Sequence, residues 1–308
     1  MAYILPILPV LLLFSLGFLL QKTRFFTEAS VADVKKIVSN IALPALLFQA
    51  FASIKIEIGY LLLVLVVFGS CLLMVLLGRI IARMLRIKSP YFAFMMGGFE
   101  MGMLGYALFI SFYGEQHLGK IALVDLGQVL FVFFVLMALL IRERDGVQST
   151  AMLIRQFVTS PVILAIFAGL LASLLSPWVE TSPMLDTLGR FVSMVGSLTV
   201  PLIAITIGYG IHIKREGLLL SLKTIAVRKI LLIVLALAIN HFIIDSLLHM
   251  EAMYRYALLV MFLTPPPFVI SIYMAQDDRQ DADYVANTLS LDTLISVLLV
   301  VVAAAVYV

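Results

Sequence analysis

Long runs of apolar residues, separated by short groups of charged and turn-forming residues, make up most of the chain. An α-helix needs about 20 such residues to cross a bilayer, and these runs have about that length. They lack the period-two alternation of membrane barrel strands, so helices must satisfy the backbone in lipid. The pattern predicts an all-α integral membrane protein with ten spans, at 3–20, 34–52, 59–82, 91–113, 118–141, 158–176, 188–211, 224–246, 254–275 and 284–307.

The composition agrees with lipid as the main solvent. Hydrophobic residues make up 63% of the 308 residues and charged residues 13%, against about 45–50% and about 25% in soluble domains. A soluble globular protein is therefore excluded. The net charge of +3 is spread over short connections, which excludes the basic surface that nucleic-acid binding requires.

Basic residues indicate the orientation of the spans. Most of the 21 lysines and arginines lie near the odd-numbered connections, and the exceptions are Lys55, Lys120, Arg190 and Arg255. Because positive charge favours the cytoplasmic side, the odd connections are expected in the cytoplasm and both termini outside. We therefore expect a multi-pass protein of the inner, or plasma, membrane.

The two halves of the chain echo each other. Residues 1–141 and 158–308 each hold five predicted spans, joined by a cytoplasmic connection at 142–157. The second and seventh spans each carry one mid-span proline, Pro44 and Pro201. Since five is an odd number, successive halves must enter the membrane from opposite sides, which predicts an inverted repeat.

Two segments at matching places in the halves have little support for a regular helix. Residues 97–105 of the fourth span carry four glycines, and residues 264–267 of the ninth read Thr-Pro-Pro-Pro. Within a helix, proline costs about 3 kcal/mol and glycine about 1 kcal/mol. Broken helices that cross at the midplane can present dipole ends and free carbonyls to a ligand. The alternative is a small-residue packing face with simple proline kinks.

These two segments form the predicted substrate cradle. Its candidate residues are Gly98, Glu100, Gly102, Gly105, Tyr106, Thr264, Pro265, Pro266 and Pro267. We expect no lysine or arginine at mid-depth to neutralise the charge of a cargo.

Glu100 is the most informative single residue, because it lies near the centre of the predicted fourth span. An ionisable side chain at that depth is a candidate functional site by default. A neutral carboxyl there would carry a proton, whereas a bound cation would keep it ionised. Asp125, Gln128, Asn287 and Asp292 are the other candidates for ion coupling. For the carboxylates the alternative is a purely structural role.

The ten spans, the Asn40 to Pro44 segment, the Gly-rich fourth span and the Pro-rich ninth span resemble the auxin efflux carrier family, the bacterial permeases related to the plant PIN-FORMED carriers. The resemblance implies a fold like that of bile-acid sodium symporters. Spans 1, 2, 6 and 7 would be a scaffold, and spans 3–5 and 8–10 a mobile transport domain. It also implies an elevator movement, a homodimer through the scaffold, and a substrate at the crossover of spans four and nine, with Asn40 added to the substrate-binding candidates.

The sequence departs from that family at the fourth span. Family members usually carry an asparagine and a proline at this crossover, where the present chain has Glu100 and the Gly105-Tyr106 pair. The break must then depend on glycine.

The resemblance also implies small organic anions, such as malate, malonate or an indole carboxylate, as cargo. The predicted function is secondary active transport of such an anion, coupled to protons or sodium. A non-transporting receptor or scaffold that binds a small ligand is the alternative, and a channel is a third. Membrane lipid is an expected partner. No enzymatic motif, cofactor site, metal site or nucleic-acid partner is predicted.

Overall fold

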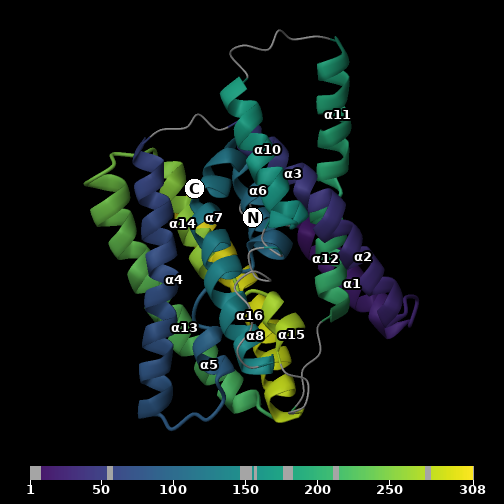
Figure 1. Cartoon of the computed structure of the whole chain (residues 1–308). Helices are drawn as coiled ribbons and strands as arrows, with labels where there is room; N and C mark the ends of the chain where they lie inside the picture. The colour runs from purple at the N-terminus through teal and green to yellow at the C-terminus, as the bar shows by residue number, and fades with distance from the viewer. Residues whose placement is uncertain are drawn as a thin grey trace. The chain divides into compact units, whose positions relative to one another are not determined.

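The computed structural model describes residues 8–53, 58–145, 155, 158–175, 183–210, 215–274 and 279–307. All regular secondary structure in these residues is helical, as the sequence predicts. In the first half the described α-helices are α1 (Leu8–Lys22), α2 (Glu28–Ile37), α3 (Leu43–Ala52), α4 (Ile58–Met84), α5 (Tyr91–Phe94), α6 (Tyr106–Tyr113), α7 (Leu118–Phe131) and α8 (Met137–Asp145). In the second half they are α10 (Pro161–Leu175), α11 (Pro183–Ser197), α12 (Thr199–Gly210), α13 (Leu218–Ile239), α14 (Ala252–Leu263), α15 (Val269–Tyr273) and α16 (Arg279–Tyr307) (Figure 1).

Short turns of other helix types connect several of these elements. They are the π-helical turns η1 (Val38–Ala42), η2 (Met101–Gly105), η4 (Val132–Leu136) and η6 (Asn240–Asp245), and the 3₁₀ turn η3 (Glu115–His117). Because η1 joins α2 directly to α3, the helical segment of the predicted second span begins at Glu28, earlier than the predicted residue 34. Thr27 caps this helix, because its hydroxyl accepts a hydrogen bond from the backbone N–H of Ser30 at 3.1 Å.

Helices lie within all ten predicted spans, but they differ in length. In the part of the chain that the structure describes, four helical segments are long and apolar enough to cross a membrane: Gly59–Met84, Glu115–Arg144, Pro183–Gly210 and Arg279–Ala305. Leu11–Lys22, Pro161–Leu175 and Ala252–Leu263 are shorter apolar helices. This architecture is that of an integral membrane protein, while the count of ten spans and the inverted repeat stay predictions.

The long helix α4 illustrates why lipid must cover much of the surface. Leu61, Leu65 and Leu76 are more than half exposed, whereas Leu63 and Val67 on the same helix are fully buried. A continuous apolar face of this kind is unusual on a protein surrounded by water. Lipid chains would cover it without cost.

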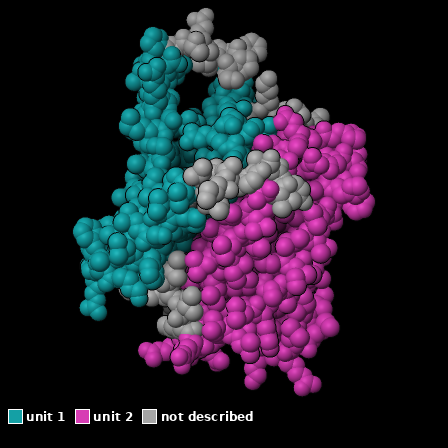
Figure 2. All heavy atoms as spheres, turned by 180° about the vertical axis from the view of Figure 1, so that it is seen from behind, with its two compact units in different colours: residues 1–57, 102–123, 156–211 teal, residues 58–101, 124–155, 212–308 magenta. Residues whose placement is uncertain are grey.

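The chain forms two compact units (Figure 2). The first comprises residues 1–57, 102–123 and 156–211, and the second residues 58–101, 124–155 and 212–308. The first, second, sixth and seventh predicted spans fall in the first unit, and the third and the eighth to tenth in the second. The fourth and fifth spans are divided between the two. The assignment of a scaffold and a transport domain stays a prediction.

In the first unit, α1 and α12 pack closely through a reciprocal pair of glycines. A Cβ added to Gly17 of α1 would collide with the carbonyl of Ile205, and one added to Gly208 of α12 would collide with the carbonyl of Phe14. Glycine lets the two helix backbones approach closely, as it does in many membrane helix pairs.

In the second unit, both predicted helix breaks are present. The first break, residues 95–100, separates α5 from η2, and the second break, residues 264–268, separates α14 from α15. α13 packs against both α14 and α16, which places its side chains beside the second break.

Candidate substrate and ion site at the two helix breaks

Gly98 allows the first break to lie directly against the second. Its φ of +78° belongs to the left-handed region, where a side chain would be strained. A Cβ at this position would also lie 2.8 Å from Cγ of Pro267. Glycine is therefore needed here both for the backbone conformation and for the close contact.

Glu100 joins the two breaks through two hydrogen bonds. Its backbone N–H donates to the carbonyl of Pro265 at 2.9 Å, and its carboxylate Oε2 accepts from the backbone N–H of Phe268 at 2.6 Å. The side chain is only 7% exposed. The structure thus brings Glu100, Gly98 and the proline segment together, as the predicted cradle requires.

The three prolines of the second break leave backbone carbonyls without their usual helical donors. In a regular helix the carbonyls of residues 261–263 would accept from the N–H groups of residues 265–267, which proline lacks. The carbonyl of Met261 accepts instead from the hydroxyl of Thr264 at 2.7 Å. The carbonyl of Leu263 accepts from Nζ of Lys229 at 2.6 Å. Side chains therefore contribute hydrogen bonds to two of these carbonyls, and that of Met261 also accepts from the backbone N–H of Thr264 at 3.1 Å.

Arg228, near the middle of α13, satisfies carbonyls of both breaks with one guanidinium group. Nε donates to the carbonyl of Met95 at 2.9 Å and Nη2 to that of Gly98 at 2.7 Å, both in the first break. Nη1 donates to the carbonyl of Thr264 in the second break at 2.7 Å. The side chain is fully buried, so these bonds form away from water, where an unsatisfied carbonyl would be costly.

An aromatic stack extends the contacts of this arginine. Phe99 of the first break stacks on Phe262 of α14, with ring centroids 4.8 Å apart and an interplanar angle of 15°. The guanidinium of Arg228 lies 5.4 Å from the centroid of Phe99. This distance is within the range of a cation–π interaction.

Asp292, near the middle of α16, provides the negative charge opposite two buried cations. Its Oδ1 lies 2.7 Å from Nζ of Lys229, and its Oδ2 lies 3.5 Å from Nη1 of Arg228. Ser296 also donates to Oδ1 at 3.2 Å. We call Arg228, Lys229 and Asp292 the buried ion cluster. It carries a formal charge of +1 beside the two breaks.

A comparison with known protein families covers the first break. Residues 2–150 match the model of a family described as membrane transport protein. Over these residues the chain is similar to this family, which is of the auxin efflux carrier type. No curated protein matches the chain closely enough to be counted as a relative. The match supports the resemblance inferred from the sequence, and it indicates a membrane transport protein.

Two residues of the candidate site were missed by the sequence interpretation. Arg228 and Lys229 were counted with the basic residues of the seventh connection, and no basic side chain was expected at the crossover. That expectation is wrong, because both side chains are buried and hydrogen-bonded to the breaks. The sequence did contain an indication of this, because both residues lie inside the predicted span 224–246, where a charged side chain needs a partner.

The remaining predicted ion-coupling residues are less closely grouped. Asp292 reaches the breaks through the buried ion cluster. Asn287, five residues earlier on α16, donates from Nδ2 to the carbonyl of Glu216 at 2.6 Å. Asp125 and Gln128 are buried on α7.

The other substrate candidates lie in the first unit. Gly102 and Gly105 belong to η2, and the buried Tyr106 begins α6. Asn40 is exposed in η1 and donates to the carbonyl of Lys36 at 2.8 Å. Their roles in binding stay predictions.

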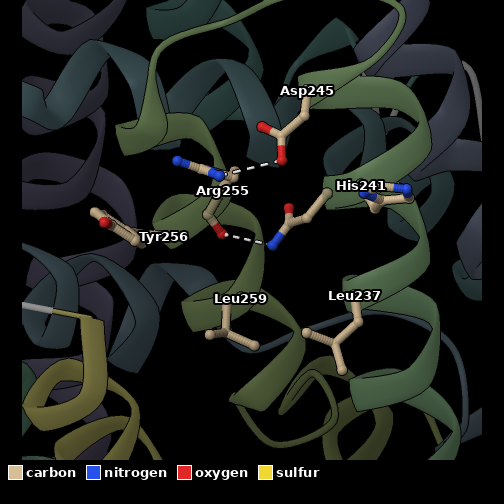
Figure 3. A pocket seen from close by; sticks show the side chains of 7 residues that line it. Leu237, His241, Asp245, Arg255, Tyr256 and Leu259 are labelled. Atoms are coloured by element: carbon tan, nitrogen blue, oxygen red, sulfur yellow. Dashed lines mark hydrogen bonds and ion pairs between the residues drawn. The ribbon is translucent and has the colours of Figure 1, made fainter.

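A pocket lined by both polar and apolar side chains lies elsewhere in the second unit and contains none of the predicted site residues (Figure 3). It has a volume of about 250 Å³ and is lined by Leu237, Asn240, His241, Asp245, Arg255, Tyr256 and Leu259. Arg255 pairs with Asp245 at 3.1 Å, and its carbonyl accepts from Asn240 at 3.3 Å. Both charged side chains are more than a third exposed, so their environment differs sharply from that of the buried ion cluster.

Proposed function

We propose that this protein is a secondary active transporter of a small organic anion, a mono- or dicarboxylate such as malate, malonate or an auxin-like acid. The observation that carries the proposal is the contact between two helix breaks whose carbonyls are held by Arg228 and Lys229. In transporters, discontinuous helices that meet in this way form the substrate site.

The electrostatics of the breaks favour an anion when Glu100 is protonated. Arg228 and Lys229 then outnumber Asp292 by one formal charge, which an ionised Glu100 would cancel, and charge interactions are strong in a low-dielectric interior. Both cations are buried and occupied by carbonyls, so they would act on a bound anion through their field rather than by direct contact. Their role is to position the backbone and to offset the charge of the cargo.

Glu100 is the proposed coupling residue. An ionised carboxylate makes a stronger hydrogen bond with the N–H of Phe268 than a protonated one does. Proton binding would therefore weaken the bond that joins the two breaks. Such a change links the protonation state to the conformation of the substrate cradle.

The proposed movement is of the elevator type. The second unit holds both breaks and the buried ion cluster, so it is the candidate for the part that carries the substrate. The buried contacts would keep the site intact while this unit moves.

Counterflow in proteoliposomes tests the proposal. Vesicles loaded with an unlabelled carboxylate are expected to accumulate the labelled form, and a panel of mono- and dicarboxylates identifies the class. A receptor would bind without exchange, so binding without counterflow for every carboxylate would refute transport.

Two carboxylate variants then test the coupling residue. Glu100→Gln is expected to flatten the pH dependence of counterflow, whereas the exposed Glu115→Gln keeps it. If Glu100→Gln retains both the pH profile and the cation dependence of the unmodified protein, Glu100 is not the coupling residue.

A further inference from the structure

The ammonium group of Lys229 has an environment that resembles the ligand shell of a metal cation. Its Nζ lies 2.6 Å from the carbonyl oxygen of Leu263, 3.1 Å from that of Thr264, 2.9 Å from Oγ of Ser296 and 2.7 Å from Oδ1 of Asp292. A lysine ammonium has three protons, so these four oxygens exceed the number of separate hydrogen bonds it can donate. They surround a positive charge as oxygen ligands surround an ion.

The origin of these oxygens is typical of sodium sites in membrane transporters. Two are backbone carbonyls at the C-terminal end of a broken helix, which in such proteins coordinate Na⁺. The carbonyl of Leu263 is free of its helical donor because residue 267 is proline. A carboxylate and a hydroxyl, from Asp292 and Ser296, complete a shell of hard oxygen ligands.

The Lys229 ammonium also gives this site the same net charge that a bound monovalent cation would give it. Without the ammonium, Arg228 and Asp292 form a pair of zero net charge, and the ammonium adds one positive charge. A bound Na⁺ would add the same charge at the same place. Both the ligand geometry and the charge therefore fit either species.

We infer that Lys229 is a permanently attached counterpart of a sodium ion: its ammonium fills a cation site at the second break, so that this site needs no sodium. This inference rests on the proposed function and deepens it. Because the site needs no sodium ion, the proton at Glu100 is left as the coupling ion. The inference predicts that the site becomes a sodium site when the ammonium is removed.

Thermal unfolding of the purified protein tests this without any transport measurement. Melting temperature is measured as Na⁺ replaces N-methyl-D-glucamine at constant ionic strength. The unmodified protein is expected to show no difference between these cations. Lys229→Ala is expected to be less stable in N-methyl-D-glucamine and to regain several degrees, saturably, as Na⁺ binds to the folded state alone.

Two variants serve as controls. Lys229→Met removes the charge but fills the space with an apolar chain, so it should lose stability without regaining it in Na⁺. Lys223→Ala, an exposed lysine of the same helix, should respond to neither. Methylammonium should partly replace Na⁺ in Lys229→Ala, because it returns an ammonium to the four oxygens.

Specific outcomes would overturn the inference. Stabilisation of the unmodified protein by Na⁺ means that the site is not filled by Lys229. Indifference of Lys229→Ala to Na⁺ and to methylammonium means that the four oxygens do not form a cation site.

If Lys229→Ala does not fold in any cation, counterflow by the unmodified protein supplies the second measurement. Replacement of N-methyl-D-glucamine by Na⁺ should change neither its rate nor its KM, and stimulation by Na⁺ refutes the inference. Absence of all carboxylate exchange refutes the proposed function instead, and the melting temperature of the unmodified protein in Na⁺ and in N-methyl-D-glucamine then decides on Lys229, because stabilisation by Na⁺ would refute the inference.

Discussion

Replacement of Asp292 by asparagine isolates the energetic role of the buried ion cluster. The variant keeps the shape of the side chain but removes the negative charge that lies 2.7 Å from Lys229 and 3.5 Å from Arg228. Two buried cations then remain without a counter-ion. Removal of one partner of a buried ion pair typically costs about 3–5 kcal/mol.

The contacts of the two cations place the expected loss at the lower end of that range. Lys229 keeps the carbonyls of Leu263 and Thr264 and the hydroxyl of Ser296. Arg228 keeps its three carbonyl partners. We therefore expect Asp292→Asn to lower the free energy of unfolding by about 3 kcal/mol.

Reversible unfolding in detergent, followed by circular dichroism, measures this loss. Asp245→Asn is the matched control, because its pair with Arg255 is more than a third exposed and should contribute no more than about 1 kcal/mol. The double variant Lys229→Met/Asp292→Asn should lose less than the sum of the single losses, since both charges leave together. A loss for Asp292→Asn as small as that of Asp245→Asn would refute the reasoning.

Three further substitutions test the contacts at the breaks. Gly98→Ala should destabilise by at least about 1–2 kcal/mol because of its left-handed backbone and the contact with Pro267, while Gly69→Ala, with open space around it, should not; equal melting temperatures would contradict this. Arg228→Lys should lose at least about 2 kcal/mol, because an ammonium cannot span carbonyls of both breaks, and near-normal stability in urea unfolding would argue against that bridge. Phe99→Leu should lower the free energy of unfolding by about 1–2 kcal/mol, because aromatic and cation–π interactions are lost. The same urea titration measures this, and an unchanged free energy of unfolding would show that the stack contributes nothing.

The positions of both helix breaks could be predicted from the sequence because their causes are local and covalent. The prolines at 265–267 lack backbone donors, and the glycines around Gly98 permit a left-handed turn. Neither property depends on what packs nearby. For the same reason Glu100 could be selected as a buried functional candidate before its partner Phe268 was known.

The buried ion cluster could not be predicted in the same way. A basic residue a few positions inside a predicted span looks the same in sequence whether it extends to the membrane surface or turns inward. The direction of Arg228 is decided by the rotation of α13 against α14 and α16. The register of α16 likewise sends Asn287 to Glu216 and Asp292 to the breaks.

The bridge made by Arg228 also has a consequence for biosynthesis. The carbonyls of Met95 and Gly98 are 133 and 130 residues away from the arginine that satisfies them, so the ribosome must make more than a hundred further residues before their partner exists. Until then the first break can meet its hydrogen-bonding needs only with water or with the insertion machinery. A nascent chain released before α13 should therefore be recognised as incomplete by quality control. The segment 2–150 that matches the family model therefore does not contain the side chain that satisfies the carbonyls of its own helix break.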